Sequence, residues 1–123
     1  METHKGISHK NQECWRRARD LTVNIYRLVS DSPLNFDQEL KEALTKTTVS
    51  VMSHIAMGNE QSVQTEFIKH LRYARISLVT LRTYLVIIRE LGYIGEGDFL
   101  DFDDQSIQIA VFIDNLIKKN KVS

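Results

Sequence analysis

The stretch Phe67–Ile88, FIKHLRYARISLVTLRTYLVII, decides the fold of this chain. Its apolar residues recur in alternating steps of four and three: Phe67, Leu71, Ala74, Leu78, Leu81, Leu85 and Ile88. Steps of four and three place side chains on one face of an α-helix. The stretch therefore predicts a long helix, from about Ser62 to Leu91, that buries one continuous seam.

A helix with the same rhythm is predicted near the start of the chain. Apolar residues from Cys14 to Leu28 follow steps of four and three, which predicts a helix over residues 11–30. Pro33 cannot continue this helix. The first ten residues, METHKGISHK, are polar and aperiodic, so a disordered tail is predicted for residues 1–10.

The segment between Pro33 and Gly58 predicts a thin helix over Phe36–Met57. Asn35, followed three residues later by Gln38, has the pattern of an N-cap with a capping box. Gly58 is the expected C-terminal stop. The buried seam of this helix is predicted to include Leu40, Leu44, Thr47, Val51 and His54, so His54 is expected to be largely buried.

A last helix is predicted after the glycine-rich acidic loop Gly92–Asp101. Asp103 is expected to cap it, and it should reach about Lys119. No segment shows the alternation of a strand. Four helices with short connections predict an all-α, antiparallel up-and-down four-helix bundle that forms a single domain over residues 11–120.

The overall composition limits the classes of function. Sixteen Lys and Arg balance sixteen Asp and Glu, so only a local patch could hold a polyanion. The single cysteine, Cys14, excludes an intramolecular disulfide. No export signal opens the chain and no apolar run could span a membrane, so we expect a cytoplasmic protein without a membrane partner.

Side chains with catalytic or metal-binding chemistry form no convincing site. Ser50 and His54 are one helical turn apart and could pair as nucleophile and base, but a mid-helix serine has no free backbone amides for an oxyanion hole. The histidines and Cys14 lack metal-ligand spacing. The acidic residues of the last loop lack the glycine and closing glutamate of a calcium loop. We therefore expect no enzyme activity, no metal and no cofactor.

Two of the helices are more apolar than a monomer needs. Outside the main seam, the third helix carries residues such as Val79 and Val86, and the fourth carries Phe112. A second apolar face on each helix predicts self-association. Val79, Val86 and Phe112 are therefore the candidate residues of an oligomer interface.

Basic residues form two different patterns. Arg75, Arg82 and Arg89 recur at heptad spacing beside the seam, where such charges usually meet carboxylates of a neighbouring helix. A second set should face solvent and gives the candidate nucleic-acid contacts. These are Arg16, Arg19 and Arg27 of the first helix, and Lys118 and Lys119 of the last helix, which Lys121 follows.

Several motifs in this order resemble a known bacterial family. They are Trp15-x-x-Ala18, Ile25-Tyr26, the segment Val49–Gly58, Glu66-Phe67, Ser77-Leu78 and Leu91-Gly-Tyr-Ile94. The family consists of small four-helix-bundle proteins first noticed as reading frames inside intervening sequences of large-subunit ribosomal RNA genes. A related protein is the accessory variability protein of diversity-generating retroelements, which engages nucleic acid and a reverse transcriptase.

The resemblance implies a bundle that assembles into a homo-oligomeric ring, with five subunits as the expected number. It also implies an adaptor that binds RNA, DNA or a nucleic-acid-handling protein without catalysing a reaction. The alternative is a self-assembly or protein-binding scaffold with no nucleic-acid binding. Zero net charge leaves both open.

Overall fold

Four α-helices and one short 3-10 helix make up the fold. The computed structural model describes residues 9–121. Its elements are α1 (His9–Ser30), η1 (Pro33–Phe36), α2 (Gln38–Asn59), α3 (Gln64–Glu90) and α4 (Glu96–Asn120). Within the described residues there is no strand. The prediction of an all-α fold with four helices is confirmed.

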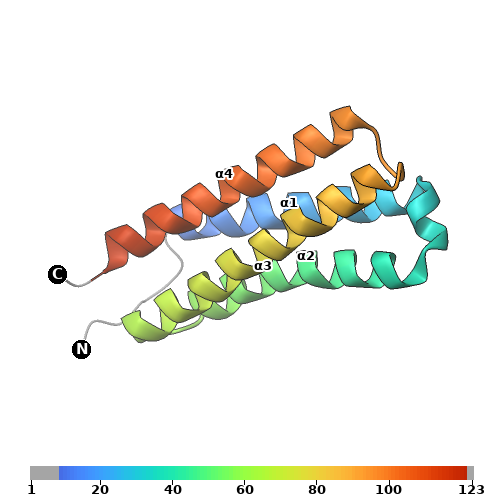
Figure 1. The fold of residues 1–123 in the computed structure, drawn as a ribbon. Coiled ribbons are helices and arrows are strands. Elements are labelled where there is room, and N and C mark those ends of the chain that lie inside the picture. Colours follow the sequence, from blue (N-terminus) through green and yellow to red (C-terminus); the bar gives the residue numbers. More distant parts are fainter. Residues whose placement is uncertain (1–8, 122–123) are drawn as a thin grey trace.

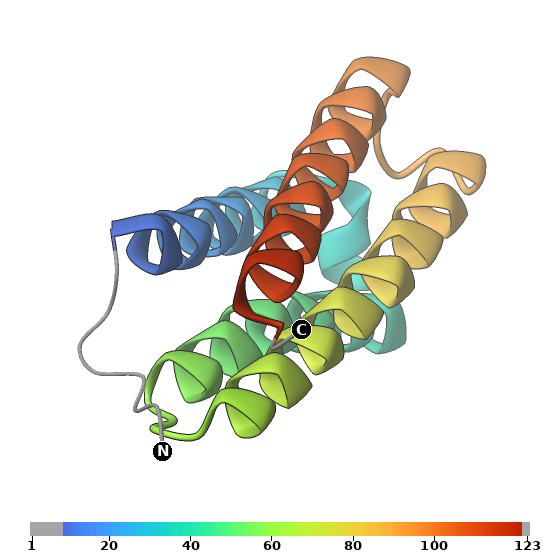
Figure 2. The same ribbon diagram turned by 90° about the vertical axis from the view of Figure 1, so that its left-hand side faces the viewer.

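The helices are arranged so that each packs against two neighbours (Figures 1 and 2). α2 and α3 form the most extensive pair, and α4 and α1 complete the bundle by packing on α3 and α2 and on each other. Gln64 at the start of α3 hydrogen bonds to Asn120 at the end of α4. At the opposite end, the Tyr93 hydroxyl donates to Asp37 before α2 over 2.9 Å. The start of α1 and the end of α2 also line a common cavity, at the end of the bundle where Gln64 contacts Asn120.

The core follows the seam of α3. All seven predicted seam residues have no exposed surface, and they pack against buried side chains of the other three helices. Phe67, Leu71 and Leu78 are among the largest fully buried side chains. Burying a side chain of this size stabilises the folded state by about 1.5–3 kcal/mol. The long apolar repeat is therefore a large contribution to stability.

The seam of α2 differs from the predicted one at two of its five positions. Its buried residues are Leu44, Thr48, Val51, Ile55, Gly58 and Asn59. Thr47 and His54 are only half-buried, so their predicted places in the seam were wrong. Thr48 can occupy the core because its hydroxyl donates to the Leu44 carbonyl over 2.8 Å.

The start of α2 also differs from the prediction. Asp37, not Asn35, is the N-cap, and its carboxylate accepts from the Leu40 amide over 3.2 Å. Asn35 lies inside η1, so the predicted capping box was wrong. Pro33 fixes its own φ near the helical value and starts this extra turn, which delays α2.

Three further helix ends differ from the prediction. α2 continues through Gly58 to Asn59, so Gly58 is not its C-terminal stop. α4 begins at Glu96, after Gly95 in an extended conformation, so Asp103 is not its cap. Gly92 has a φ of 75° and reverses the chain after α3, and of the two glycines that follow only Gly97 lies within α4. α1 begins at His9, so it includes the last two residues of the predicted tail. Residues 1–8 of that tail lie outside the described residues.

The heptad arginines of α3 pair with α4, as predicted. Arg75 contacts Asp114 over 3.1 Å and Arg82 contacts Asp103 over 2.8 Å. Arg89 lies 3.8 Å from Glu96. These pairs fix the register of α4 along α3, while each exposed pair contributes only about 0–1 kcal/mol.

Gly58 allows α2 to approach α3 closely. A Cβ atom added there would lie 3.3 Å from both the Phe67 carbonyl oxygen and the His70 Cβ. We expect Gly58→Leu to lower the free energy of unfolding by about 1–3 kcal/mol, because a larger side chain would force the helices apart.

Gly97→Leu is the matched control, since no atom lies within 4 Å of a Cβ added at Gly97. Replacing glycine in a helix should there raise stability by up to about 1 kcal/mol. Urea denaturation followed by circular dichroism measures the free energy of unfolding of both variants. Equal effects of the two changes would contradict the importance of the α2–α3 approach.

Candidate nucleic-acid interface

Charged side chains are sorted along the long axis of the bundle. The first half of α1, the second half of α2, the first half of α3 and the second half of α4 share one end. Ten Lys and Arg lie at this end: Lys10, Arg16, Arg17, Arg19, Lys69, Arg72, Arg75, Lys118, Lys119 and Lys121. Only four acidic residues accompany them: Glu13, Glu60, Glu66 and Asp114. We refer to this end as the basic end.

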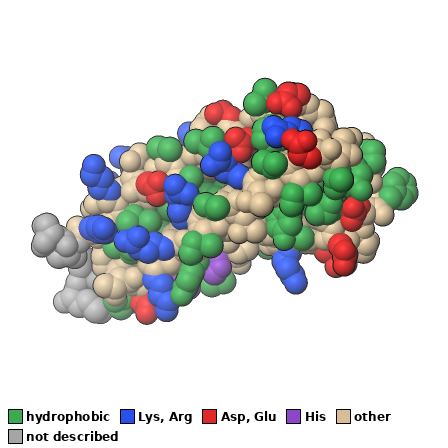
Figure 3. Space-filling model, viewed as in Figure 1, with side chains coloured by type: hydrophobic (Ala, Val, Ile, Leu, Met, Phe, Trp, Pro, Cys, Tyr) green, Lys and Arg blue, Asp and Glu red, His purple; other side chains and the backbone are tan. Residues whose placement is uncertain are grey.

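The opposite half, the acidic end, has the reverse balance. Its eleven carboxylates are Asp20, Asp31, Asp37, Glu39, Glu42, Glu90, Glu96, Asp98, Asp101, Asp103 and Asp104. Five basic residues lie there: Arg27, Lys41, Lys46, Arg82 and Arg89. In Figure 3 the blue side chains gather over the half in which α1 begins and α4 ends. A neutral chain thus presents a strongly basic surface at one end.

The fold brings most of the predicted nucleic-acid contacts together. Arg16, Lys118 and Lys119 are exposed at the basic end. Arg19 lies at the same end, but its guanidinium contacts Asp20 over 3.1 Å and covers the Trp15 ring. Arg27 is exposed at the acidic end, away from the other four.

The groove between α1 and α4 adds two basic residues, Lys10 and Arg17, to the predicted contacts. Lys10 and Lys119 line one cavity of about 330 Å³ together with Phe112. The Arg17 guanidinium lies 5.4 Å from the centre of the Phe112 ring. Phe112 therefore lies in this groove, whereas the other two predicted interface residues, Val79 and Val86, are exposed on α3.

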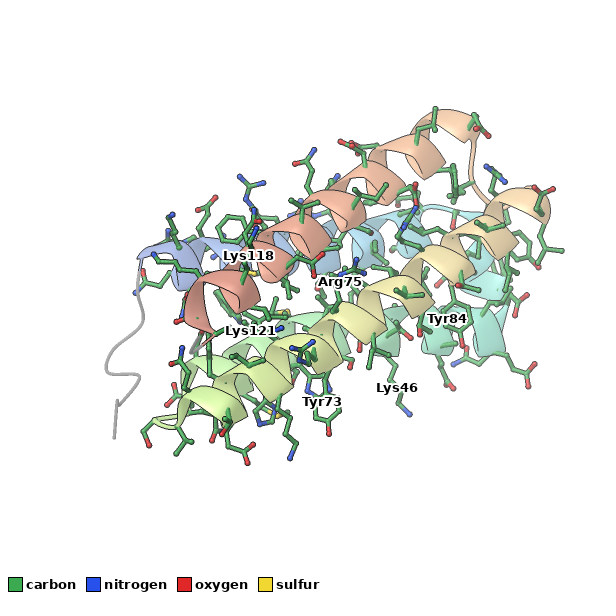
Figure 4. The ribbon with its side chains drawn as sticks, turned by 60° about the vertical axis from the view of Figure 1, so that its left-hand side comes forward. Lys46, Tyr73, Arg75, Tyr84, Lys118 and Lys121 are labelled. Carbon is green, nitrogen blue, oxygen red and sulfur yellow. The ribbon has the colours of Figure 1, made fainter. Side chains whose placement is uncertain are left out.

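Aromatic rings gather where α2 meets α3. The His54 ring lies 5.3 Å from the Tyr73 ring and 6.1 Å from the His70 ring, measured between centroids. Tyr73 is exposed, and Figure 4 shows it with Lys46 and Tyr84 along the same side of the molecule. The same view places Lys118 and Lys121 at the end of α4. Of these rings only Tyr73 is exposed, and Lys46 belongs to the acidic end.

Ser50 and His54 do not form a catalytic pair. The Ser50 hydroxyl is bonded to the Ser77 hydroxyl over 2.9 Å, which joins α2 to α3. Nδ1 of His54 is buried without a hydrogen-bond partner, contrary to the bonded ring that a seam position would require. Burial also raises the pKa of the Cys14 thiol to about 12, so this group is a poor nucleophile.

The described residues offer neither a metal-binding cluster nor a membrane-spanning helix. Within residues 9–121, no group of three or more His, Cys, Asp or Glu side chains is placed to hold a metal ion. None of the helices in this range combines the length and the apolar character that a membrane crossing needs.

These features define a small four-helix-bundle protein with one basic end. The profile of the 23S rRNA-intervening sequence protein family matches residues 10–115. The chain therefore belongs to this family, and the resemblance noted in its sequence is confirmed.

A comparison with solved structures agrees on the fold. The chain is similar to a crystal structure of a protein with unknown function from the S23 ribosomal protein family of Bacteroides thetaiotaomicron VPI-5482. The TM-score is 0.76, the sequence identity is 16%, and the match covers 89% of this chain and 98% of that chain. At this identity the likeness shows the fold alone. A comparison with curated protein sequences finds no match.

The histidine at the α2–α3 contact predicts a pH dependence of stability. Burial, aided by the nearby His70, lowers the pKa of His54 below its ordinary value of 6.5. The unfolded chain therefore binds this proton more tightly than the folded chain does. The contribution to stability is complete above the ordinary pKa and is lost as the pH falls through it toward the folded-state pKa.

We expect the urea concentration at the unfolding midpoint to decrease as the pH is lowered from about 7.5 to about 5.5. The decrease should be smaller in His54→Phe, which keeps a ring at this position. Tyr73→Phe is the control, because it changes the same cluster without removing the titrating group. Identical pH profiles for His54→Phe and the parent protein would show that His54 is not the group responsible.

Proposed function

We propose that this chain is a non-enzymatic adaptor: an antiparallel up-and-down bundle that assembles into a homo-oligomeric ring and binds RNA or DNA through its basic end. The observation that carries the proposal is the gathering of ten basic side chains against four acidic ones at that end. Membership in a family linked to ribosomal RNA intervening sequences supports it.

The electrostatics of the basic end suit phosphate contacts. Lys118, Lys119 and Lys121 are exposed where α4 ends, and Arg16 is exposed where α1 begins. Exposed Lys and Arg release counterions from nucleic acid when they contact phosphates, which gives salt-dependent binding with little sequence preference. The acidic end repels the same polyanion, so binding from the basic end is favoured.

An apolar face over α3 and α4 supports self-association. Val79 and Val86 alternate along α3 with the arginines that pair with α4, so they lie on the flank beside that helix. Ile107 is one turn beyond Asp103 on the matching flank of α4, and Val111 is one turn before Asp114. The exposed fractions of these four side chains are 52%, 40%, 38% and 52% in chain order.

A second apolar face lies on the opposite side of the bundle, over α1 and α2. The Thr22 hydroxyl lies 3.4 Å from the Thr48 carbonyl oxygen, which marks the flank of α1 beside α2. Tyr26, one turn after Thr22, is exposed, as are Val23 and Val49. Two different apolar faces on opposite sides suit a head-to-tail interface, which closes into a ring when the rotation between subunits allows it.

The first test concerns nucleic acid. We expect single-stranded RNA to bind with a dissociation constant on the order of micromolar at low salt. Replacing Arg16, Lys118 and Lys119 together with glutamine should weaken binding and reduce the salt dependence, since about 0.7 counterions are released for each lost phosphate contact with a single strand. Filter binding over a range of salt concentrations measures both quantities.

The matched control changes Arg27, Lys41 and Lys46 to glutamine, which removes the same charge from the acidic end. It should leave the salt dependence nearly unchanged. Equal weakening by both triple variants, or no retention of RNA by the parent protein, contradicts binding through the basic end. The latter result favours the protein-binding scaffold, for which the two apolar faces would be the interaction surfaces.

The second test concerns assembly. Light scattering coupled to gel filtration should give a mass several times the 14.3 kDa of one chain, with five subunits expected. Val79→Glu combined with Val86→Glu should reduce that mass, because a ring contact would bury both new charges. Leu91→Glu, at an exposed apolar residue after α3, is the control and should assemble normally. A parent protein that is monomeric at micromolar concentration contradicts the ring.

A further inference from the structure

A cavity of about 380 Å³ opens between α1 and α2 at the basic end. Its lining residues are Gln12, Trp15 and Arg16 from α1, Ala56 and Asn59 from α2, and Glu60 just after α2. A volume of this size lies in the range of small-ligand sites. The cavity therefore combines a flat indole ring with a few polar groups next to a cationic surface.

One polar atom in this cavity has no partner. Asn59 is 7% exposed, yet its side-chain oxygen is buried and accepts no hydrogen bond. A buried acceptor left unpaired costs about 1–3 kcal/mol. Asn59 lines the cavity, so a rotation of its amide would present this oxygen to a ligand with an N–H donor, and the ligand would recover this free energy on binding.

The positive charge in the cavity lining favours a ligand that carries a phosphate as well as an N–H donor. The Arg16 guanidinium is exposed and lies 3.3 Å from the Gln12 side-chain oxygen, which holds it at the rim. It can contact a phosphate while a ring attached to that phosphate enters the cavity. The Arg19 guanidinium lies 5.6 Å from the centre of the Trp15 ring and places a second positive charge beside the indole.

We infer that the cavity holds one unstacked nucleobase of a bound single strand, an inference that rests on the proposed nucleic-acid function. The base contacts Trp15, an amino group of the base donates to Asn59 Oδ1, and the adjoining phosphate contacts Arg16. Adenine, cytosine and guanine carry a projecting exocyclic amine, whereas the only base donor of uracil, N3–H, lies between two carbonyl oxygens that Asn59 Oδ1 would repel. Strands with amine-bearing bases are therefore preferred over uridylate strands.

Trp15 provides a direct readout because it is the only tryptophan in the chain. An adenylate RNA hexamer should quench its fluorescence and bind about tenfold more tightly than a uridylate hexamer, within the range for one base contact on an aromatic ring. An abasic hexamer with the same number of phosphates should bind through the basic end without quenching.

Two variants test the cavity in different ways. Asn59→Leu removes the acceptor, and Ala56→Phe fills the space without changing a polar group. Each should reduce adenylate affinity about tenfold, to the uridylate level. Asn115→Leu, the same kind of change at an exposed position of the basic end, should leave both affinity and quenching unchanged. Thermal melts identify any variant that fails to fold. If one of the two cavity variants fails to fold, the affinity of the other tests whether the cavity binds the base.

The outcomes separate this inference from the proposed function. If RNA is retained on filters but Trp15 emission does not change and both cavity variants bind normally, the base site is overturned and binding through the basic end stands. If no oligonucleotide is retained but adenosine monophosphate quenches Trp15, the base site stands without the proposed function. Equal affinity for adenylate and uridylate strands overturns the amine preference and the role of Asn59.

Discussion

The fold depends on how closely α2 can approach α3. At Gly58 the two helices are so near that an added Cβ would lie 3.3 Å from the Phe67 carbonyl oxygen. Farther along, the Ser50 and Ser77 hydroxyls join the same helices over 2.9 Å. Small residues on α2 therefore let the seam of α3 be covered completely, and α1 and α4 then pack on the pair. The short distance also holds the His54 and His70 rings together without partners for their Nδ1 atoms.

The sequence was sufficient to predict the seam of α3, which apolar residues alone mark. All seven predicted seam positions of α3 are buried, because Leu, Ile and Phe leave no doubt about the phase of the helix. In α2 the neighbours Thr47 and Thr48 have the same side chain, so the phase could not be read there, and His54 was placed where Ile55 lies. The predicted starts of α2 and α4 were wrong for a related reason. Pro33 and the glycines around Gly95 permit several local structures, and tertiary contacts select one of them.

The candidate interface was only partly visible in the sequence. Individual residues such as Arg16 and Lys119 could be identified as exposed, but a net charge of zero concealed how the charges are distributed in space. The sorting appears once the ends of the four helices are paired, since basic segments around residues 10–19, 69–75 and 118–121 then meet. A count of charge in each half of each predicted helix could have found it. The buried Asn59 oxygen could not have been found in this way, because its burial depends on contacts between helices.

Opposite charges at the two ends also give each molecule a permanent electric dipole along its length. Neutral proteins of this kind attract one another end to end, with the positive pole of one facing the negative pole of the next. The attraction extends over about one Debye length, about 8 Å at physiological ionic strength, and reaches much farther in dilute buffer. With a calculated isoelectric point near 6.9, little net repulsion opposes it close to neutral pH. The colloidal behaviour of this protein is therefore governed by ionic strength, and it should be handled in moderate salt.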